Sequence, residues 1–176
     1  NLLVQDLSAQ LQQRPASPEV VVIAIDERSI EAIGRWPWRR AIHAQLVRQL
    51  SAQNPKAIAL DVLFSEEDLD YPTDDALLAD AIADSGRVVL PVAQDPSGQP
   101  VGQLPALARA AAALGHVQLH VDADGGVRSF SPYAGLPGQT HLHLGLALRC
   151  VAQPRDALCA PASATSADAA ATTQPV

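Results

Sequence analysis

The sequence contains no methionine, few aromatic residues and only two cysteines. Because translation starts at methionine, the first absence predicts a segment from inside a longer protein. Aromatic residues make up 3% of the chain, so the core has to be built from valine, isoleucine, leucine and alanine. No stretch approaches the roughly 18 consecutive apolar residues that a membrane span needs. The longest strongly apolar run, Val20–Ile25, has the length of a strand.

Positive charge is also scarce. The 12 Lys and Arg residues are outnumbered by 19 Asp and Glu residues, which gives a formal net charge of −7. Such a surface repels nucleic acid, and no basic stretch compensates for it, so we expect no nucleic-acid partner. With 48% hydrophobic and 18% charged residues, the composition is typical of a globular chain. The length of 176 residues suits one well-buried domain.

Three apolar, β-branched runs dominate the first half of the chain, at residues 20–25, 57–64 and 88–92. They lack the alternation of half-exposed strands, which predicts strands covered on both faces. Helical patterns separate them, at residues 38–50 with apolar residues four apart and at residues 73–86 with Thr73 as the expected N-cap. This order predicts a parallel sheet with crossover helices.

Two further helices and a hairpin are expected in the second half. Residues 105–115 form one helical pattern with a proline in its first turn, and residues 142–151 form another. Between them, the apolar stretches 116–121 and 127–130 flank the letters DADGG, an Asp-Gly turn. The predicted fold class is therefore α/β, a mainly parallel central sheet flanked by helices, with an antiparallel hairpin near residues 116–131.

Two carboxylates lie where ligands gather in α/β proteins. Asp26 and Asp61 lie at the ends of the first two predicted strands, and the crevice outside strand carboxyl ends is the usual binding site in open sheets. Together they could hold a cation or an amine. Alternatively, Asp26 caps the helix that begins at Glu27, and Asp61 bonds to loop backbone. Both interpretations stay open.

The letters GRWPWRRAIH form the most unusual segment. Trp36 and Trp38 flank a proline, and Arg40 follows, so the segment could capture an anionic or aromatic ligand by cation–π stacking and paired hydrogen bonds. The alternative, which we favour, is that the tryptophans are large buried plugs in a core that is poor in aromatics.

Catalytic, metal and cofactor signals are weak. Asp122 and Asp124 lack the further oxygen ligands of a calcium loop, and no Cys/His spacing is typical of zinc. Ser29 and His43 show no defined triad spacing with Asp26. We therefore expect no catalytic residue, no bound metal and no cofactor. Cys150 and Cys159 are close enough in sequence for a disulfide, but two reduced, apolar side chains explain them equally well.

Taken together, several segments resemble one family. The stretches VVIAIDERSIEAIGRWPWRRAIHAQLVRQL, KAIALDVLFSE, RVVLPVA and ALGHVQLHVDADGGVRSF are similar, in this order, to CHASE2 domains, over about residues 20–150. The resemblance rests on these family-signature positions: Asp26, Ser29, Gly34, Trp36, Pro37, Trp38, Arg40, His43, Asp61, Phe64, Asp124, Gly125 and Arg128.

The resemblance implies an extracytoplasmic sensor domain of a bacterial transmembrane receptor, periplasmic and without catalysis of its own. The parent protein would carry flanking transmembrane helices and a cytoplasmic histidine kinase, nucleotide cyclase, diguanylate cyclase or Ser/Thr kinase. The expected partners are an unknown small-molecule ligand and a second copy in a homodimer. The candidate ligand contacts are Asp26, Ser29, Trp36, Trp38, Arg40, His43, Asp61 and Arg128.

The predicted organisation has three parts. Residues 1–18 form a lead helix that follows a membrane segment absent from this chain, residues 19–153 form the sensor domain, and residues 154–176 form a linker rich in Ala, Ser, Thr and Pro. The family usually has Pro at Arg39 and Asn at Gln118, and its pattern continues past Val176. Two alternatives remain: an assembly module without a small ligand, and a hydrolase with Mg²⁺ between Asp26 and Asp61.

Overall fold

The computed structural model describes residue 15 and residues 17–136 and 139–159. It divides the chain into two compact units, residues 1–37 and residues 38–176, which we describe separately. The lead helix expected over residues 1–18 lies almost wholly outside the described residues, as does most of the linker expected over residues 154–176.

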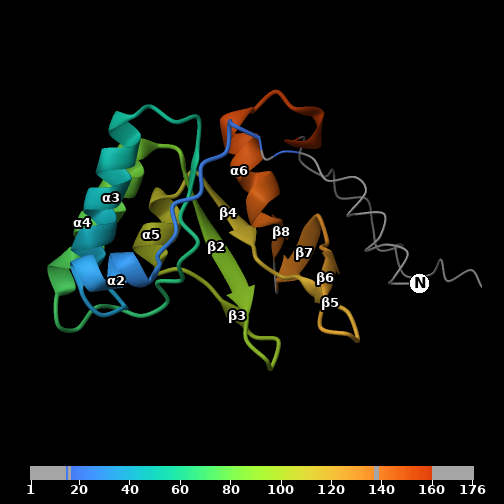
Figure 1. Cartoon of the computed structure of the whole chain (residues 1–176), viewed down its shortest axis with the longest axis horizontal. Coiled ribbons are helices and arrows are strands. Elements are labelled where there is room, and N and C mark those ends of the chain that lie inside the picture. Colours follow the sequence, from blue (N-terminus) through green and yellow to red (C-terminus); the bar gives the residue numbers. More distant parts are fainter. Residues whose placement is uncertain (1–14, 16, 137–138, 160–176) are drawn as a thin grey trace, which may run out of the picture. The chain divides into compact units, whose positions relative to one another are not determined.

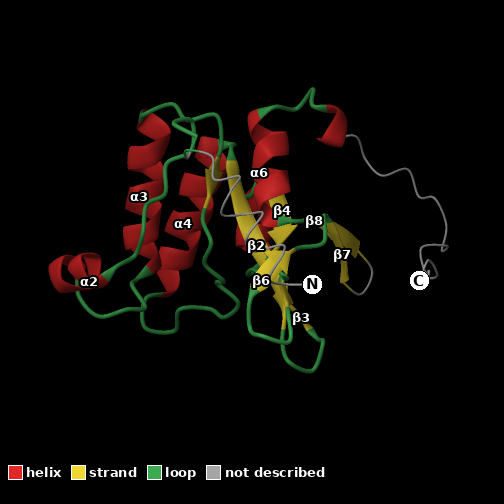
Figure 2. Ribbon diagram, turned by 45° about the vertical axis from the view of Figure 1, so that its right-hand side comes forward, coloured by secondary structure: helices red, strands yellow, loops and turns green. Residues whose placement is uncertain are grey.

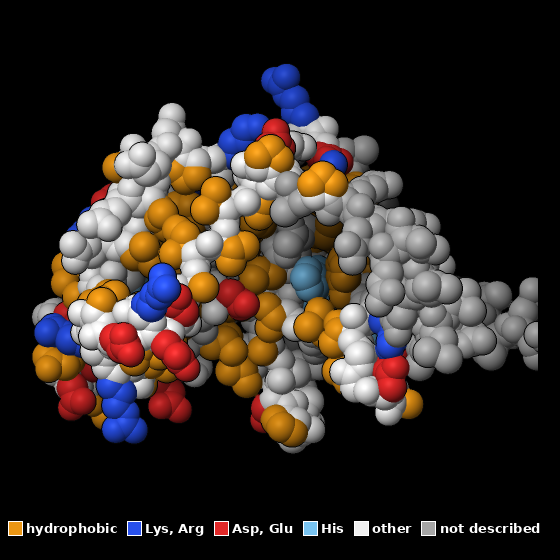
Figure 3. Space-filling model, viewed as in Figure 1, with side chains coloured by type: hydrophobic (Ala, Val, Ile, Leu, Met, Phe, Trp, Pro, Cys, Tyr) orange, Lys and Arg blue, Asp and Glu red, His pale blue; other side chains and the backbone are white. Residues whose placement is uncertain are grey.

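In the first unit, helix α2 (Glu27–Ile33) is the one described regular element. It begins after Asp26 and ends at Gly34, whose φ of 116° suits a residue without a Cβ. The strand expected over Val20–Ile25 is wrong for the described structure, because these residues form no ladder with any described strand. Their side chains are exposed, with Val22 at 85%. Figure 3 shows many hydrophobic side chains on one face of the molecule. Apolar composition alone does not make a strand, since each strand needs a hydrogen-bonding neighbour.

The second unit is built around strand β2 (Val88–Gln94). It pairs in parallel with β1 (Ile58–Ala59) and with β4 (Ala113–His116), in the registers Ile58 to Val88 and Val89 to Ala113. Its last residues pair antiparallel with β3 (Pro100–Val101). The observed sheet is therefore mixed.

Helices cover both faces of this sheet (Figures 1 and 2). On one side lie α3 (Arg40–Ala52), α4 (Pro72–Ser85) and α5 (Pro105–Ala110). On the other side lies α6 (Leu144–Ala152), followed by a short 3₁₀ turn (Ala157–Cys159). The α/β class expected from the sequence is confirmed by this arrangement.

Successive residues of β2 belong to two different cores. Val88 and Leu90 pack with Leu78 of α4 and with α3 and α5, whereas Val89 packs with Leu144 and other residues of α6. All three β2 side chains are fully buried. Because neighbouring side chains of a strand point to opposite faces, an unbroken apolar run is what a strand between two helical layers requires.

Two antiparallel ladders follow the sheet. Strands β5 (His120–Val121) and β6 (Val127–Ser129) form the first, and β7 (Tyr133–Leu136) and β8 (Gln139–Leu142) form the second. The first is the hairpin predicted around DADGG, with Gly125 at a φ of 81° in its turn. Its first strand is shorter than the expected residues 116–121, because His116 belongs to β4 and β5 begins at His120.

Several local predictions are corrected. A mainly parallel sheet is not seen, and only residues 58–59 of the run 57–64 are strand. The helix expected over 105–115 ends at Ala110, because the following residues pair with β2 as β4. Gly115 lies in β4, where a Cβ would be 2.6 Å from the Leu144 Cα, so glycine lets α6 approach the sheet. Tertiary pairing here outweighs the helix propensity of alanine.

The helix expected over residues 73–86 is confirmed as α4, with a different start. Its N-cap is Tyr71 without a side-chain hydrogen bond, whereas Thr73 lies inside the first turn. Of its two adjacent leucines, Leu77 is 40% exposed, while Leu78 is fully buried. Gly86 ends the helix in the left-handed conformation, with a φ of 61°.

The adjacent leucines of α4 give a matched pair of variants. We expect Leu78→Ala to lower the free energy of unfolding by about 2–5 kcal/mol, because it leaves a cavity between α4 and β2. Leu77→Ala should change it by less than about 1 kcal/mol, because its side chain is largely exposed. Urea unfolding followed by circular dichroism measures both, and equal losses would contradict the described core.

Candidate functional site

The candidate ligand contacts fall in different units of the structure. Asp26, Ser29 and Trp36 belong to residues 1–37, and the other five belong to residues 38–176: Trp38, Arg40, His43, Asp61 and Arg128.

Asp26 is the N-cap of α2, as one of the two sequence interpretations proposed. Its carboxylate accepts hydrogen bonds from the Ser29 backbone N at 2.9 Å and from the Ser29 Oγ at 2.8 Å. These hydrogen bonds from Ser29 lower the pKa of Asp26, so the cap stays ionised at neutral pH. Trp36 of the same unit is partly buried and precedes Pro37 through a cis peptide bond.

Arg40 lies in the first turn of α3 and reaches carboxylates at the start of α4. Its guanidinium lies 3.2 Å from Asp75 Oδ1 and 3.6 Å from Asp68 Oδ2, and it donates to the Glu66 carbonyl oxygen at 2.8 Å. It also lies 5.4 Å above the ring centre of Phe64. An anionic ligand at Arg40 would have to compete with these partners.

The neighbouring Arg39 forms an ion pair that sequence reasoning missed. Its Nε donates to Asp74 Oδ2 at 3.0 Å and its Nη2 to Asp74 Oδ1 at 3.2 Å, while the guanidinium stacks 3.4 Å from the ring centre of Tyr71. The Asp74 side chain is buried, and the hydrogen bond from Arg39 lowers its pKa. The positive charge of Arg39 is thus neutralised within the chain. The signal in the sequence was the acidic first turn of α4.

His43 lies in the core between two aromatic rings. It is 1% exposed, and its ring centre lies 5.2 Å from that of Phe64 and 6.2 Å from that of Trp38. Burial lowers the pKa of His43 to about 4, and the positive charge of Arg40 adds to the effect. The imidazole is therefore neutral at pH 7. Trp38 is 7% exposed, which confirms it as a buried core residue.

The last two candidates lie apart from this cluster in sequence. Asp61 is an exposed residue after β1. Arg128 of β6 closes its own hairpin, because its guanidinium lies 2.8 Å from Asp122 Oδ2 and 2.8 Å from Asp124 Oδ2. The hydrogen bond from Arg128 is the main reason why the pKa of Asp124 falls to about 2. The Asp-x-Asp-Gly segment thus forms an ion-paired turn.

A polar cavity that sequence reasoning did not find lies elsewhere in the second unit. It has a volume of about 320 Å³, and these residues line it: Gln94, Gln118, Leu119, His120, Ser131, Tyr133 and Ala134. Gln94 is the last residue of β2, and Gln118 comes two residues after β4. A polar cavity at the carboxyl ends of parallel strands is the usual place for a ligand in an α/β protein.

His116 supports this cavity from inside the protein. It is fully buried, and its Nδ1 accepts a hydrogen bond from the Gln118 backbone N at 3.2 Å. Its ring packs edge-on against His143, the N-cap of α6, at 5.2 Å between ring centres. Burial lowers the pKa of His116, which keeps its ring neutral and able to accept this bond.

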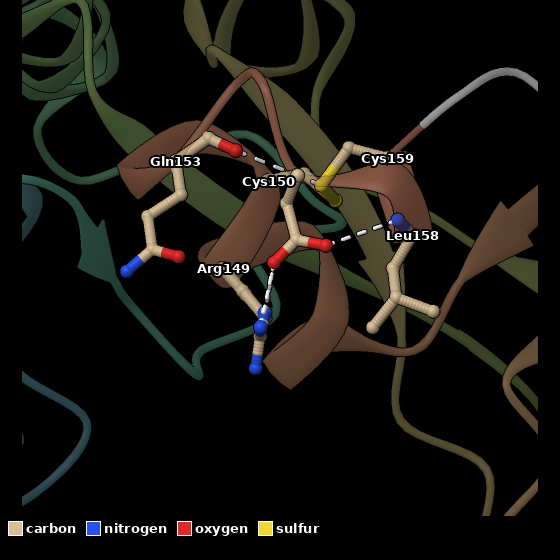
Figure 4. The surroundings of a disulfide bond; sticks show 6 residues. Arg149, Cys150, Gln153, Leu158 and Cys159 are labelled. Carbon is tan, nitrogen blue, oxygen red and sulfur yellow. Dashed lines mark hydrogen bonds and ion pairs between the residues drawn. A yellow bond between two sulfur atoms is a disulfide. The ribbon is translucent and has the colours of Figure 1, made fainter.

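A disulfide joins Cys150 of α6 to Cys159, with Cα atoms 5.3 Å apart (Figure 4). Hydrogen bonds also fix the loop between the two cysteines. The Asp156 carboxylate accepts a hydrogen bond from Arg149 Nε at 2.7 Å and one from the Leu158 backbone N at 3.0 Å. Of the two interpretations of the cysteines, the structure thus shows the disulfide.

Two negative findings apply to the described residues alone. Among them, no group of three or more His, Cys, Asp and Glu side chains is placed to hold a metal ion. None of their helices combines the length and the apolar composition of a membrane span.

The buried His43 makes stability depend on pH. Its pKa falls from 6.5 in the unfolded chain to about 4 in the folded one, so the unfolded state binds more protons between these values. Stability is therefore full above pH 6.5 and decreases as the pH falls toward 4, by roughly 3 kcal/mol from this residue. In urea unfolding at pH 7.5 and pH 4.5, His43→Gln should lose less stability on acidification than the wild type.

The control for this measurement is Gln49→Leu, because Gln49 is an exposed residue of α3 that does not titrate. This variant should show the pH dependence of the wild type. An equally steep loss in His43→Gln and in the wild type would rule out His43 as the source of the acid sensitivity.

The disulfide should contribute stability by closing a short loop. For a sequence separation of 9 residues, the chain-entropy estimate is about 2–3 kcal/mol. The double variant Cys150→Ser with Cys159→Ser should lose this amount in urea unfolding, and the wild type should lose the same amount in reductant. If reductant lowered the stability of the double variant as well, the loss would not come from this bond.

The comparisons with known proteins gave one match. The CHASE2 domain family model matches residues 1–173, almost the entire chain. No curated protein and no solved structure matches this chain. CHASE2 domains are extracytoplasmic sensor domains of signalling receptors and are not themselves catalytic. The resemblance seen in the sequence is therefore confirmed, and this chain belongs to the CHASE2 domain family.

Proposed function

We propose that this chain is the periplasmic sensory domain of a bacterial transmembrane receptor. The observation that carries the proposal is the family match, which extends over residues 1–173. Flanking transmembrane helices would connect the domain to a cytoplasmic output enzyme, such as a histidine kinase, a nucleotide cyclase, a diguanylate cyclase or a Ser/Thr kinase. The sensor itself needs no catalytic residue for this role.

The disulfide supports the periplasmic location. Cys150 and Cys159 are joined, and disulfides persist in oxidising compartments such as the periplasm, whereas the cytosol keeps thiols reduced. The bond ties the end of α6 to the segment that follows it. A disulfide at this position is what we expect of a domain that folds in an oxidising compartment.

The sensing mechanism that we propose is a shift between two arrangements of a receptor homodimer. A ligand changes the output only if it prefers one of the two arrangements. The eight ligand contacts predicted from the sequence remain a proposal. Within the second unit, Arg40 and Arg128 already form ion pairs with carboxylates, so a ligand there would have to rearrange those pairs.

A second candidate function is assembly without a small ligand. It is favoured by exposed apolar side chains around the β5–β6 ladder, where Val121 is 67% exposed, Leu119 54% and Val127 51%. Exposed apolar patches are typical of interaction surfaces. If assembly is the whole function, dilution should lower the melting temperature and no small molecule should raise it.

The location can be tested on Lys56, the single lysine of the chain. It is exposed, so a membrane-impermeant amine reagent should modify it in spheroplasts that contain the intact receptor. Mass spectrometry of the Lys56 peptide reads the modification, and the same peptide from sealed inside-out vesicles should stay unmodified. If the peptide reacts in the vesicles and not in spheroplasts, the periplasmic location is wrong.

The sensory role has a separate readout in the same receptor. In the proposed mechanism, the output depends on the balance between the two arrangements of the domain, and a cavity in the core disturbs that balance. Leu78→Ala should therefore change output activity at equal receptor abundance, whereas Leu77→Ala should not. If output is the same in both variants and in the wild type, the domain does not control the output enzyme.

A further inference from the structure

The polar cavity of the second unit lies where three segments of the chain meet. Gln94 comes from the carboxyl end of β2 and Gln118 from the segment after β4, while Ser131 lies just before β7 and Tyr133 is its first residue. At about 320 Å³, the cavity is at the small end of the range for ligand sites. It has room for a molecule of the size of a monosaccharide.

The lining offers both donors and acceptors. Gln118 Nε2 donates to Gln94 Oε1 across the ends of the two strands, so Gln118 Oε1 and Gln94 Nε2 are the amide atoms not used in this bond. Elsewhere in the lining, His120 Nε2 lies 3.0 Å from Ser131 Oγ. Amides, a hydroxyl and an imidazole that combine donors with acceptors suit ligands whose own groups both donate and accept.

The cavity contains no fixed charge. None of its lining residues, which all belong to the described part of the chain, is Asp, Glu, Lys or Arg. The nearest acidic residue in sequence, Asp95, is committed to its own turn: it accepts from the backbone N of Ser97 and of Gln99, each at 2.9 Å. A charged ligand would therefore lose its hydration without gaining an oppositely charged partner, and this desolvation has a high cost in free energy.

An aromatic ring and apolar groups complete the lining. Tyr133 is 43% exposed, and Leu119 and the buried Ala134 also border the cavity. Sugars and polyols present apolar C–H faces as well as hydroxyls, and ligand sites combine apolar lining with a few placed polar groups.

The polar groups are held in place before a ligand arrives. The Gln118 backbone N is bound by the fully buried His116, and Gln94 is paired with Pro100 of β3. The side-chain amide of Gln118 is held by its own hydrogen bond to Gln94 Oε1. Such prior ordering reduces the entropy that binding would cost.

We propose that this cavity binds a small neutral molecule rich in hydroxyl groups, a sugar or a polyol. The inference deepens the proposed sensory function and rests on it for its biological meaning. Occupancy would join the ends of β2 and β4 to the β7–β8 ladder, and His143 at the end of that ladder is the N-cap of α6. Ligand binding in the cavity would therefore act on the position of α6 through His143.

The test is calorimetry of the purified chain with matched probes. Glucose, galactose, ribose, myo-inositol and glycerol are the neutral set, and glucuronate and glucosamine are charged counterparts of glucose. We expect at least one neutral compound to bind with a Kd below about 1 mM, and a charged counterpart to bind at least about tenfold more weakly.

Variants place the binding in this cavity. Gln118→Asn shortens the amide by one methylene and Ser131→Ala removes the hydroxyl, and each should weaken binding by about tenfold or more. The control is Gln49→Leu, because Gln49 is exposed on α3; it should bind like the wild type. Far-UV circular dichroism confirms folding, and Ser131→Ala serves if Gln118→Asn does not fold.

The results separate this inference from the proposed function. It is overturned if no neutral probe binds with a Kd below about 1 mM. It is also overturned if glucuronate or glucosamine binds at least as tightly as the neutral probe that binds best, or if the folded cavity variants bind like the wild type. Binding by the purified chain does not depend on the membrane, and labelling of Lys56 does not depend on a ligand. Each experiment can therefore fail alone.

Discussion

The burial of β2 on both faces is the constraint on which the second unit depends. Val88, Val89 and Leu90 are fully buried, and alternate side chains meet α4 on one side and α6 on the other. With aromatics at 3% of the sequence, this contact between aliphatic side chains supplies most of the core. It holds β1 and β4 beside the strand, and it places the carboxyl ends of β2 and β4 together at the polar cavity.

Charged residues fasten the helices that cover this core. Arg39 and Arg40 at the start of α3 reach Asp74 and Asp75 at the start of α4, with Asp74 buried. Two positive charges in a first turn oppose the helix dipole, and adjacent carboxylates offset that repulsion. The segment that looked most like an anion site is thus engaged in joining two helices. Its arginines act as structural cations in the state described.

The polar cavity and the network around Arg40 differ in what they offer a ligand. Around Arg40 the charges are already paired and His43 is enclosed by Trp38 and Phe64. In the cavity, neutral amides, a hydroxyl and an imidazole surround open volume. A receptor domain gains from the second kind of site, because a ligand can enter it without breaking ion pairs that hold the fold.

The sequence by itself determined the family, the α/β class, the helix α4, the strand at 88–92 and the turn at DADGG, since these follow from local patterns and motifs. Only the tertiary structure decided that Ala113–His116 is a strand, that Gly115 admits α6, and that Gln94, Gln118 and Ser131 share a cavity. It also decided that residues 20–25 form no strand in the described chain. The reason is physical: a helix satisfies its hydrogen bonds within its own segment, whereas a strand or a cavity needs partners distant in sequence.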